Sequence, residues 1–167
     1  WPDNHLRFGA LSWVGAQIAA GHLGHWQPDL VHLHDWQAAL TAAYLHFDRS
    51  AASSPATLLT IHNLAFQGLF GAGMLPALGL PAGALDVDGM EYWGNLSFLK
   101  AGVRWADHLS TVSPTYAREI RTVEHGMGFD GLLRARPDGL TGIVNGIDDA
   151  VWNPATDPAL VAQYSVR

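Results

Sequence analysis

A polar pair of residues follows a strand-like apolar run near the middle of the chain. His62 and Asn63 come directly after residues 56–61. In an open parallel α/β sheet, ligands bind at the carboxyl ends of the strands. An imidazole donates or accepts a hydrogen bond and a carboxamide does both, so this uncharged pair suits a polyhydroxyl ligand such as a sugar. The alternative is a strand-end histidine that only caps a neighbouring backbone group.

A second apolar run, residues 29–34, ends in the same way, with Asp35 and Trp36 directly after it. The Asp35 carboxylate could accept hydrogen bonds from sugar hydroxyls, and the Trp36 indole could stack on a sugar face. The alternative for Trp36 is a residue at the start of a helix that packs on the core. Two neighbouring strands with polar residues at the same end together outline a binding site.

Two histidines in this run allow a different interpretation. His32 and His34 share one face of the strand because alternate residues do so, and Asp35 follows them. Imidazole and carboxylate ligands suit zinc or manganese, which would fit a metal-dependent hydrolase. Such a site needs further ligands where Trp36 and Gln37 stand, so it is the weaker alternative.

A third candidate follows another short apolar run. Asn145 and Gly146 come after residues 140–144, which are predicted to form a strand. Asn145 could bind a ligand at the strand end. The pair could equally be a tight turn, because Asn-Gly is a common turn pair. Both interpretations stay open.

The composition limits the classes of function. The 167 residues are 49% hydrophobic and 14% charged, which is enough for one domain with a core. With a net charge of −6 and nine scattered basic residues, the chain has no surface suited to nucleic acid. It has no cysteine, which excludes disulfides and thiol catalysis and fits a cytoplasmic protein. No apolar run reaches membrane-spanning length and no signal peptide is visible, so no membrane partner is expected.

The order of helix-like and strand-like segments predicts an α/β fold with a Rossmann-like parallel sheet and helices on both of its faces. Residues 68–88, rich in glycine and proline, are predicted to form a long functional loop with helical turns near 74–78 and 81–85. The expected helices cover residues 4–21, 36–47, 95–106 and 114–120, with a further turn at 131–135. The expected strands cover residues 29–34, 56–61, 108–112 and 140–144.

The two ends of the sequence suggest an internal piece of a longer protein. The chain starts with Trp1 rather than methionine, and residues 164–167 look helical. Residues 148–158 are rich in Pro, Asp and Asn and look like a linker, which predicts a domain boundary near residues 143–145.

Five segments in a fixed order carry a resemblance to a known family. They are HLHDWQAAL, TIHNLAFQG, DGMEYWGNLSFLKAG, TVSPTYAREI and NGIDDAVWNPATD. Together they resemble the bacterial glycogen synthases and plant starch synthases of glycosyltransferase family 5. The likeness extends over nearly the whole chain.

The resemblance implies a GT-B fold, in which two Rossmann-like domains face each other across a cleft. Residues 1–143 would be part of the N-terminal domain, and residues 144–167 would form the interdomain crossing and the start of the C-terminal domain. It also implies transfer of glucose from ADP-glucose to the non-reducing end of an α-1,4-glucan, with retention of configuration and without a metal or another cofactor. A related hexosyltransferase and a non-catalytic carbohydrate-binding domain are the alternatives, and the oligomeric state stays open.

The resemblance also assigns roles to individual residues. His62 would be the catalytic histidine that hydrogen-bonds the 6-hydroxyl of the donor glucose. Asp35, Trp36 and Asn63 would line the glucosyl and acceptor pocket, and Asn145 would also reach the glucose. The family's Lys-x-Gly-Gly loop and its arginine and lysine phosphate clamp are absent from these residues, so the chain alone is expected to lack synthase activity.

Overall fold

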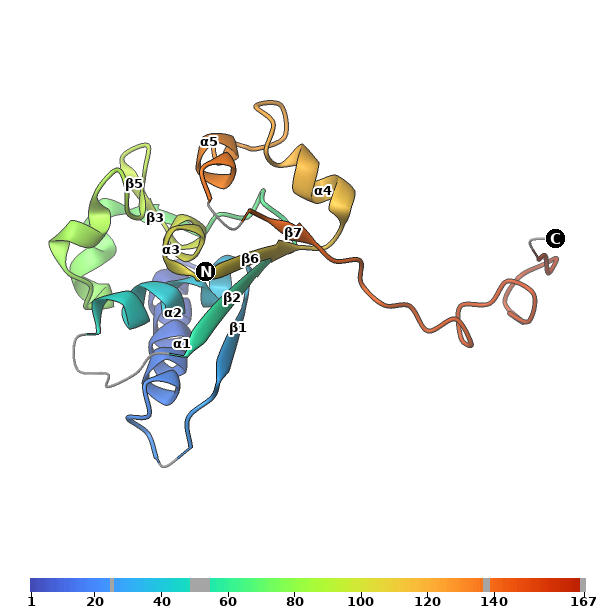
Figure 1. The fold of residues 1–167 in the computed structure, drawn as a ribbon, viewed down its shortest axis with the longest axis horizontal. Helices are drawn as coiled ribbons and strands as arrows, with labels where there is room; N and C mark the ends of the chain where they lie inside the picture. Colours follow the sequence, from blue (N-terminus) through green and yellow to red (C-terminus); the bar gives the residue numbers. More distant parts are fainter. Residues whose placement is uncertain (25, 49–54, 137–138, 166–167) are drawn as a thin grey trace.

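A parallel sheet forms the centre of the computed structural model, which describes residues 1–24, 26–48, 55–136 and 139–165. Its strand order is β1-β2-β6-β7 (Figure 1). The strands are β1 (Leu30–His34), β2 (Ala56–Ile61), β6 (His108–Thr111) and β7 (Thr141–Gly142). The predicted parallel sheet is therefore confirmed.

The strand register brings the carboxyl ends of the central strands together. His34 of β1 lies opposite Thr60 of β2, and Thr60 lies opposite Ser110 of β6. The residues that follow β1 and β2 therefore emerge side by side at one edge of the sheet. This is the edge at which open parallel sheets bind ligands.

The described helices lie on one face of this sheet (Figure 1). They are α1 (Asn4–Ala19), α2 (Asp35–Phe47), α3 (Phe98–Trp105), α4 (Pro114–Glu119) and α5 (Asp130–Arg134). Leu33, Leu59 and Leu109 turn toward these helices and are almost fully buried among them. Each of these strands therefore buries alternate side chains in the core.

The opposite face of the sheet is open, so the prediction of helices on both faces is wrong for the described residues. Leu30, His32 and His34 of β1 are exposed there, and so is His108 of β6. The prediction failed because a short apolar run does not tell whether one face or both faces of a strand are covered. In β1, the covered face belongs to Val31 and Leu33.

A second, small sheet starts in the region predicted to be a loop and ends beyond it. Its antiparallel strands are β3 (Leu69–Gly71), β5 (Asn95–Ser97) and β4 (Glu91–Tyr92), and the 3-10 helices η1 (Ala72–Leu78) and η2 (Ala82–Leu85) join β3 to β4. The predicted helical turns are confirmed. The helix predicted from residue 95 starts instead at Phe98, because residues 95–97 pair with β3 and β4. The Ser97 hydroxyl then caps α3 by accepting the Lys100 N–H at 3.1 Å.

The two ends of the chain differ from expectation in detail. Asp3 stands at the N-cap of α1 without a side-chain capping bond. β7 is shorter than the predicted strand, and an exposed segment leaves the sheet after it (Figure 1). Residues 164–165 are not helical as expected, and 166–167 lie outside the described residues. None of the helices in the described part of the chain has the length and apolar character needed to cross a bilayer.

Candidate functional site

The junction between β1 and α2 gives the site its geometry. β1 passes into α2 without a loop, and the backbone of Asp35 takes a φ of 52°, in the left-handed region. One Asp35 carboxylate oxygen accepts the backbone N–H of His62 at 2.7 Å and that of Asn63 at 3.4 Å. Asp35 therefore ties the end of β1 to the end of β2. Strained backbone of this kind clusters at functional sites.

His34 and His62 form a direct side-chain pair across the same two strand ends. His34 Nδ1 and His62 Nε2 lie 3.0 Å apart. One nitrogen must donate and the other must accept, so at least one of the two rings is neutral. In the sequence, His34 stands out only as a candidate metal ligand, so this pairing was not predicted. A signal was present, because β1 ends with a histidine and another histidine directly follows β2.

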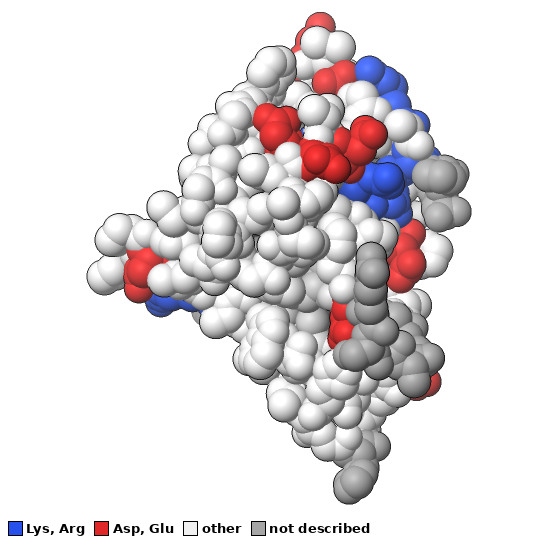
Figure 2. All heavy atoms as spheres, turned by 90° about the vertical axis from the view of Figure 1, so that its left-hand side faces the viewer, with Lys and Arg blue, Asp and Glu red and all other residues white. Residues whose placement is uncertain are grey.

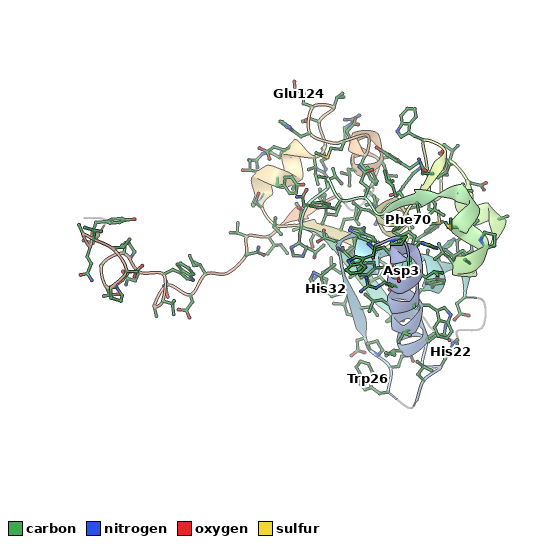
Figure 3. The ribbon with its side chains drawn as sticks, turned by 180° about the vertical axis from the view of Figure 1, so that it is seen from behind. Asp3, His22, Trp26, His32, Phe70 and Glu124 are labelled. Carbon is green, nitrogen blue, oxygen red and sulfur yellow. The ribbon has the colours of Figure 1, made fainter. Side chains whose placement is uncertain are left out.

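A separate hydrogen-bonded chain lies beside this pair on the open face of the sheet. His32 Nε2 lies 2.6 Å from Thr60 Oγ1, which lies 2.7 Å from Ser110 Oγ. The His32 and His34 rings lie next to each other, tilted by 39° with centroids 4.1 Å apart, which confirms that they share a face. Figure 3 labels His32 on β1. Desolvation lowers the pKa of His32, and the neighbouring His34 and His62 imidazoles lower it further.

The metal-hydrolase alternative gains no support from this geometry. Within residues 1–24, 26–48, 55–136 and 139–165, no group of three or more His, Asp or Glu side chains is arranged to hold a metal ion. The ring nitrogens of His34 and His62 face each other, and Nε2 of His32 faces Thr60. These nitrogens therefore serve a hydrogen-bond network.

The segment after β2 is held in place by several elements. Asn63 Oδ1 accepts the N–H of Ala65 at 2.9 Å, which makes a local turn. The Tyr116 hydroxyl of α4 accepts the N–H of Leu64 at 2.9 Å. The Thr111 hydroxyl of β6 donates to the carbonyl of Ile61 at 2.6 Å. His62 and Asn63 are thus exposed on a firmly held turn.

Trp36 stands at the start of α2 and packs on the core, as the alternative interpretation of the sequence predicted. Its half-buried indole meets the Phe8 ring edge-on, with centroids 4.7 Å apart. It also lies against Gly68, where an added Cβ would be 2.5 Å from the indole. Gly68 has a φ of +60° and cannot carry a side chain without displacing this ring. Stacking of Trp36 on a sugar stays a prediction.

Asn145 stands apart from the other four predicted site residues. It follows β7 in the exposed segment that leaves the sheet (Figure 1). The contacts of the described residues join Asp35, His62 and Asn63 with one another but do not include Asn145. Its assignment to the site stays a prediction.

The fold and this site define a Rossmann-like α/β unit with an imidazole, a carboxylate and a carboxamide at the carboxyl ends of two adjacent strands. Comparisons with known proteins narrow this class. The family model described as "Starch synthase catalytic domain" matches residues 1–135. The chain belongs to this family.

Curated relatives and a solved structure agree with this assignment. The chain is 60% identical to the glycogen synthase of Roseobacter denitrificans and 56% identical to that of Acidiphilium cryptum, and covers 34% of each. These alignments include 100% and 99% of this chain, respectively. The catalytic domain of starch synthase IV from Arabidopsis thaliana, bound to ADP and acarbose, is similar with a TM-score of 0.78 and 35% identity. That match covers 97% of this chain and 34% of that structure, so the chain spans about a third of the length of its relatives.

Proposed function

We propose that the protein carrying this chain is a retaining glucosyltransferase. It transfers glucose from ADP-glucose to the non-reducing end of an α-1,4-glucan. The observation that carries this proposal is the bonded group of Asp35, His34, His62 and Asn63 in a chain of the starch synthase family. The solved relative bound to ADP and acarbose supports a nucleotide and a glucan-like ligand.

In this proposal each side chain has a separate task. His62 binds a hydroxyl of the donor glucose through the ring nitrogen that does not face His34. His34 couples the tautomer of His62 to its own, because a bonded nitrogen pair needs one donor and one acceptor. Asp35 accepts the two backbone amides and so holds His62 and Asn63 in a fixed orientation toward the sugar. Asn63, Trp36 and Asn145 complete the sugar pocket.

The same proposal places the residues that bind the diphosphate leaving group outside this chain. The basic residues of α3 have other partners. Lys100 Nζ donates to the carbonyls of Val87 and Glu91, each at 2.6 Å, and Arg104 Nε donates to the carbonyl of Asp88 at 2.7 Å. Because Lys100 and Arg104 already have hydrogen-bond partners, this chain would bind the glucosyl group and another part of the protein would neutralise the phosphates.

Substitution of His62 in the intact protein tests this function. His62→Ala should lower kcat for ADP release in the presence of glycogen by about a hundredfold, as loss of one transition-state donor does. The Kd for ADP should stay within a few fold, because the contact is to glucose. His108→Ala, on the same open face but at the other end of the strands, is the control. Unchanged kcat in His62→Ala would rule out this role.

A non-catalytic carbohydrate-binding protein is the second candidate, favoured by the exposure of His62 and Asn63. It predicts that the intact wild-type protein binds glycogen but releases no ADP from ADP-glucose. The same assay therefore separates the two functions before any variant is made.

A further inference from the structure

Trp93 occupies a turn that does not suit a tryptophan. It joins β4 to β5 through the two-residue turn Trp93-Gly94, with φ values of 49° and 80°. Tight hairpin turns with two positive φ values favour Asn, Asp or Gly at the first position. A bulky L side chain there costs about 1–2 kcal/mol. The indole is also 83% exposed, so core packing does not compensate for this cost.

The contacts of Trp93 do not account for this strain. Asp35 and Met127 are the other non-glycine residues with positive φ among the described residues, and both have partners. The Asp35 carboxylate binds two backbone amides, and the Met127 carbonyl accepts from the Tyr92 hydroxyl at 2.6 Å and from Gln67 Nε2 at 3.1 Å. Two bonds hold the Trp93 turn, because the Trp93 carbonyl accepts from Asn95 Nδ2 at 3.4 Å and the Gly94 N–H donates to Glu91 Oε1 at 2.7 Å. Both bonds could form with Asn or Gly in place of Trp93, and the one ring contact of the indole among the described residues is edge-on with Tyr92 at 6.4 Å. They therefore do not explain why this turn carries an exposed indole, which points to a ligand.

A pocket of about 460 Å³ lies beside the Trp93 indole, a volume in the range of small-molecule sites. Its lining includes Tyr92, Phe129 and Leu132, together with Glu91 and Lys100. The two charged groups have internal partners. Lys100 Nζ donates to two carbonyls, and Glu91 Oε1 accepts the N–H of Gly94 at 2.7 Å. The pocket therefore offers aromatic faces and polar atoms to an uncharged ligand.

Charged side chains of both signs lie close together around this hairpin. Figure 2 shows the side of the molecule that is on the left in Figure 1, where β3 and β5 lie. Acidic and basic side chains gather together toward the upper end of that face, the end at which the hairpin lies, and most of the rest of the face carries neither. A ligand with a large net charge of either sign would find no extended complementary surface here.

We propose that Trp93 and this pocket bind an α-1,4-glucan chain at a second carbohydrate site, separate from the His62 group. The C–H face of a pyranose carries partial positive charge and packs on the negative face of an indole. The choice of an α-1,4-glucan rests on the proposed function.

The site is also connected to the strand ends. The Met127 carbonyl joins Tyr92 of the hairpin to Gln67, which follows Asn63 by four residues. A glucan held at Trp93 is thereby kept near the His62 group, which raises its local concentration there.

Substitution of Trp93 in the intact protein tests the site. Trp93→Asn gives the Asn-Gly pair that such turns favour, so Tm should stay the same or rise. The Kd for maltoheptaose should rise about tenfold, the effect of losing one stacking platform. Trp93→Tyr should retain most of the affinity. The control is Trp26→Asn, because Trp26 is also exposed, at 69%. It lies between α1 and β1 at the lower end of the molecule (Figure 3), whereas the hairpin that ends in β5 lies at the upper end (Figure 1).

Three outcomes would overturn the site: unchanged maltoheptaose affinity in Trp93→Asn, an equal loss in Trp26→Asn, or a lower Tm or altered oligomeric state in Trp93→Asn. The last outcome would make Trp93 part of a structural or subunit contact. Wild-type protein that binds maltoheptaose at Trp93 but releases no ADP from ADP-glucose would contradict only the transferase function. Wild-type protein that releases ADP, with Trp93→Asn binding maltoheptaose normally, would contradict only this site.

Discussion

Asp35 shows how one residue sets the geometry of the candidate site. Its left-handed backbone turns the chain from strand to helix in a single step. That turn directs the carboxylate across to the backbone of His62 and Asn63. Aspartate adopts this conformation more often than most L residues do. The same residue therefore makes the turn and bridges the two strand ends.

The pH dependence of stability provides a prediction at this scale. The pKa of His32 is lowered in the folded protein by desolvation and by the His34 and His62 imidazoles, so the unfolded chain binds more protons below about pH 6.5. Desolvation and Arg104 lower the pKa of His46 in the same way. The free energy of unfolding should therefore decrease as the pH is lowered below about 6.5.

His32→Gln in the intact protein should flatten that dependence, because glutamine can still bond Thr60 but does not titrate in this range. The measurement is Tm between about pH 5 and pH 7.5. His108→Gln, at the other end of the open face, is the matched control. An unchanged pH slope of Tm in His32→Gln would contradict the prediction.

The sequence could predict the residues of the site better than their partners. His62 and Asn63 follow a strand-length apolar run, and the rule for strand ends placed them at a ligand-binding edge. The bonds from Asp35 and His34 to His62 depend on which strands are neighbours and in what register. That information is non-local, so residue types alone did not reveal these bonds.

At the scale of elements, the packing of α3 on α2 depends on one glycine. A Cβ added to Gly102 would lie 2.7 Å from the Cβ of Ala39 and 2.9 Å from a methyl carbon of Leu59. Both neighbours are fully buried and belong to the main core. The two helices can approach this closely only because Gly102 has no side chain.

Gly102→Ala should therefore destabilise the intact protein by about 1–3 kcal/mol through overpacking, although alanine is the better helix former. Gly131→Ala in α5 is the matched control, because an added Cβ there meets nothing within 4 Å. The control should be neutral or stabilising by about 0.5–1 kcal/mol. Denaturant unfolding measures both variants. Equal stability of the two would show that α3 can move away from α2 at little cost.

The elements that were predicted correctly have strong local signals. Ser113 accepts the N–H of Tyr116 at 2.9 Å as the expected cap of α4, and Pro114 begins that helix. The small sheet was missed because β3, β4 and β5 have only two or three residues each. Segments of that length show no periodicity, and β3 pairs with β5 over a separation of 24 to 28 positions in sequence.

At the scale of the whole molecule, the main sheet has an open face and a free edge. In the order β1-β2-β6-β7, β1 has a neighbour on one side only among the described residues. Leu30 of β1 is 51% exposed, and α1 also exposes Leu11, Val14 and Ile18. An unpaired strand beside exposed apolar side chains is a template for edge-to-edge association.

The isolated 167-residue polypeptide should therefore associate through β1 when it is made without the rest of its protein. Size-exclusion chromatography with light scattering should show oligomers or aggregates. Leu30→Lys should shift the population toward monomer, because a lysine on an edge strand opposes pairing with another copy. Val123→Lys is the matched control, since it places the same charge on an exposed apolar residue of a loop outside the main sheet. A monomeric, cooperatively melting wild-type chain would contradict the prediction, and equal rescue by Val123→Lys would show that net charge, rather than the β1 edge, controls association.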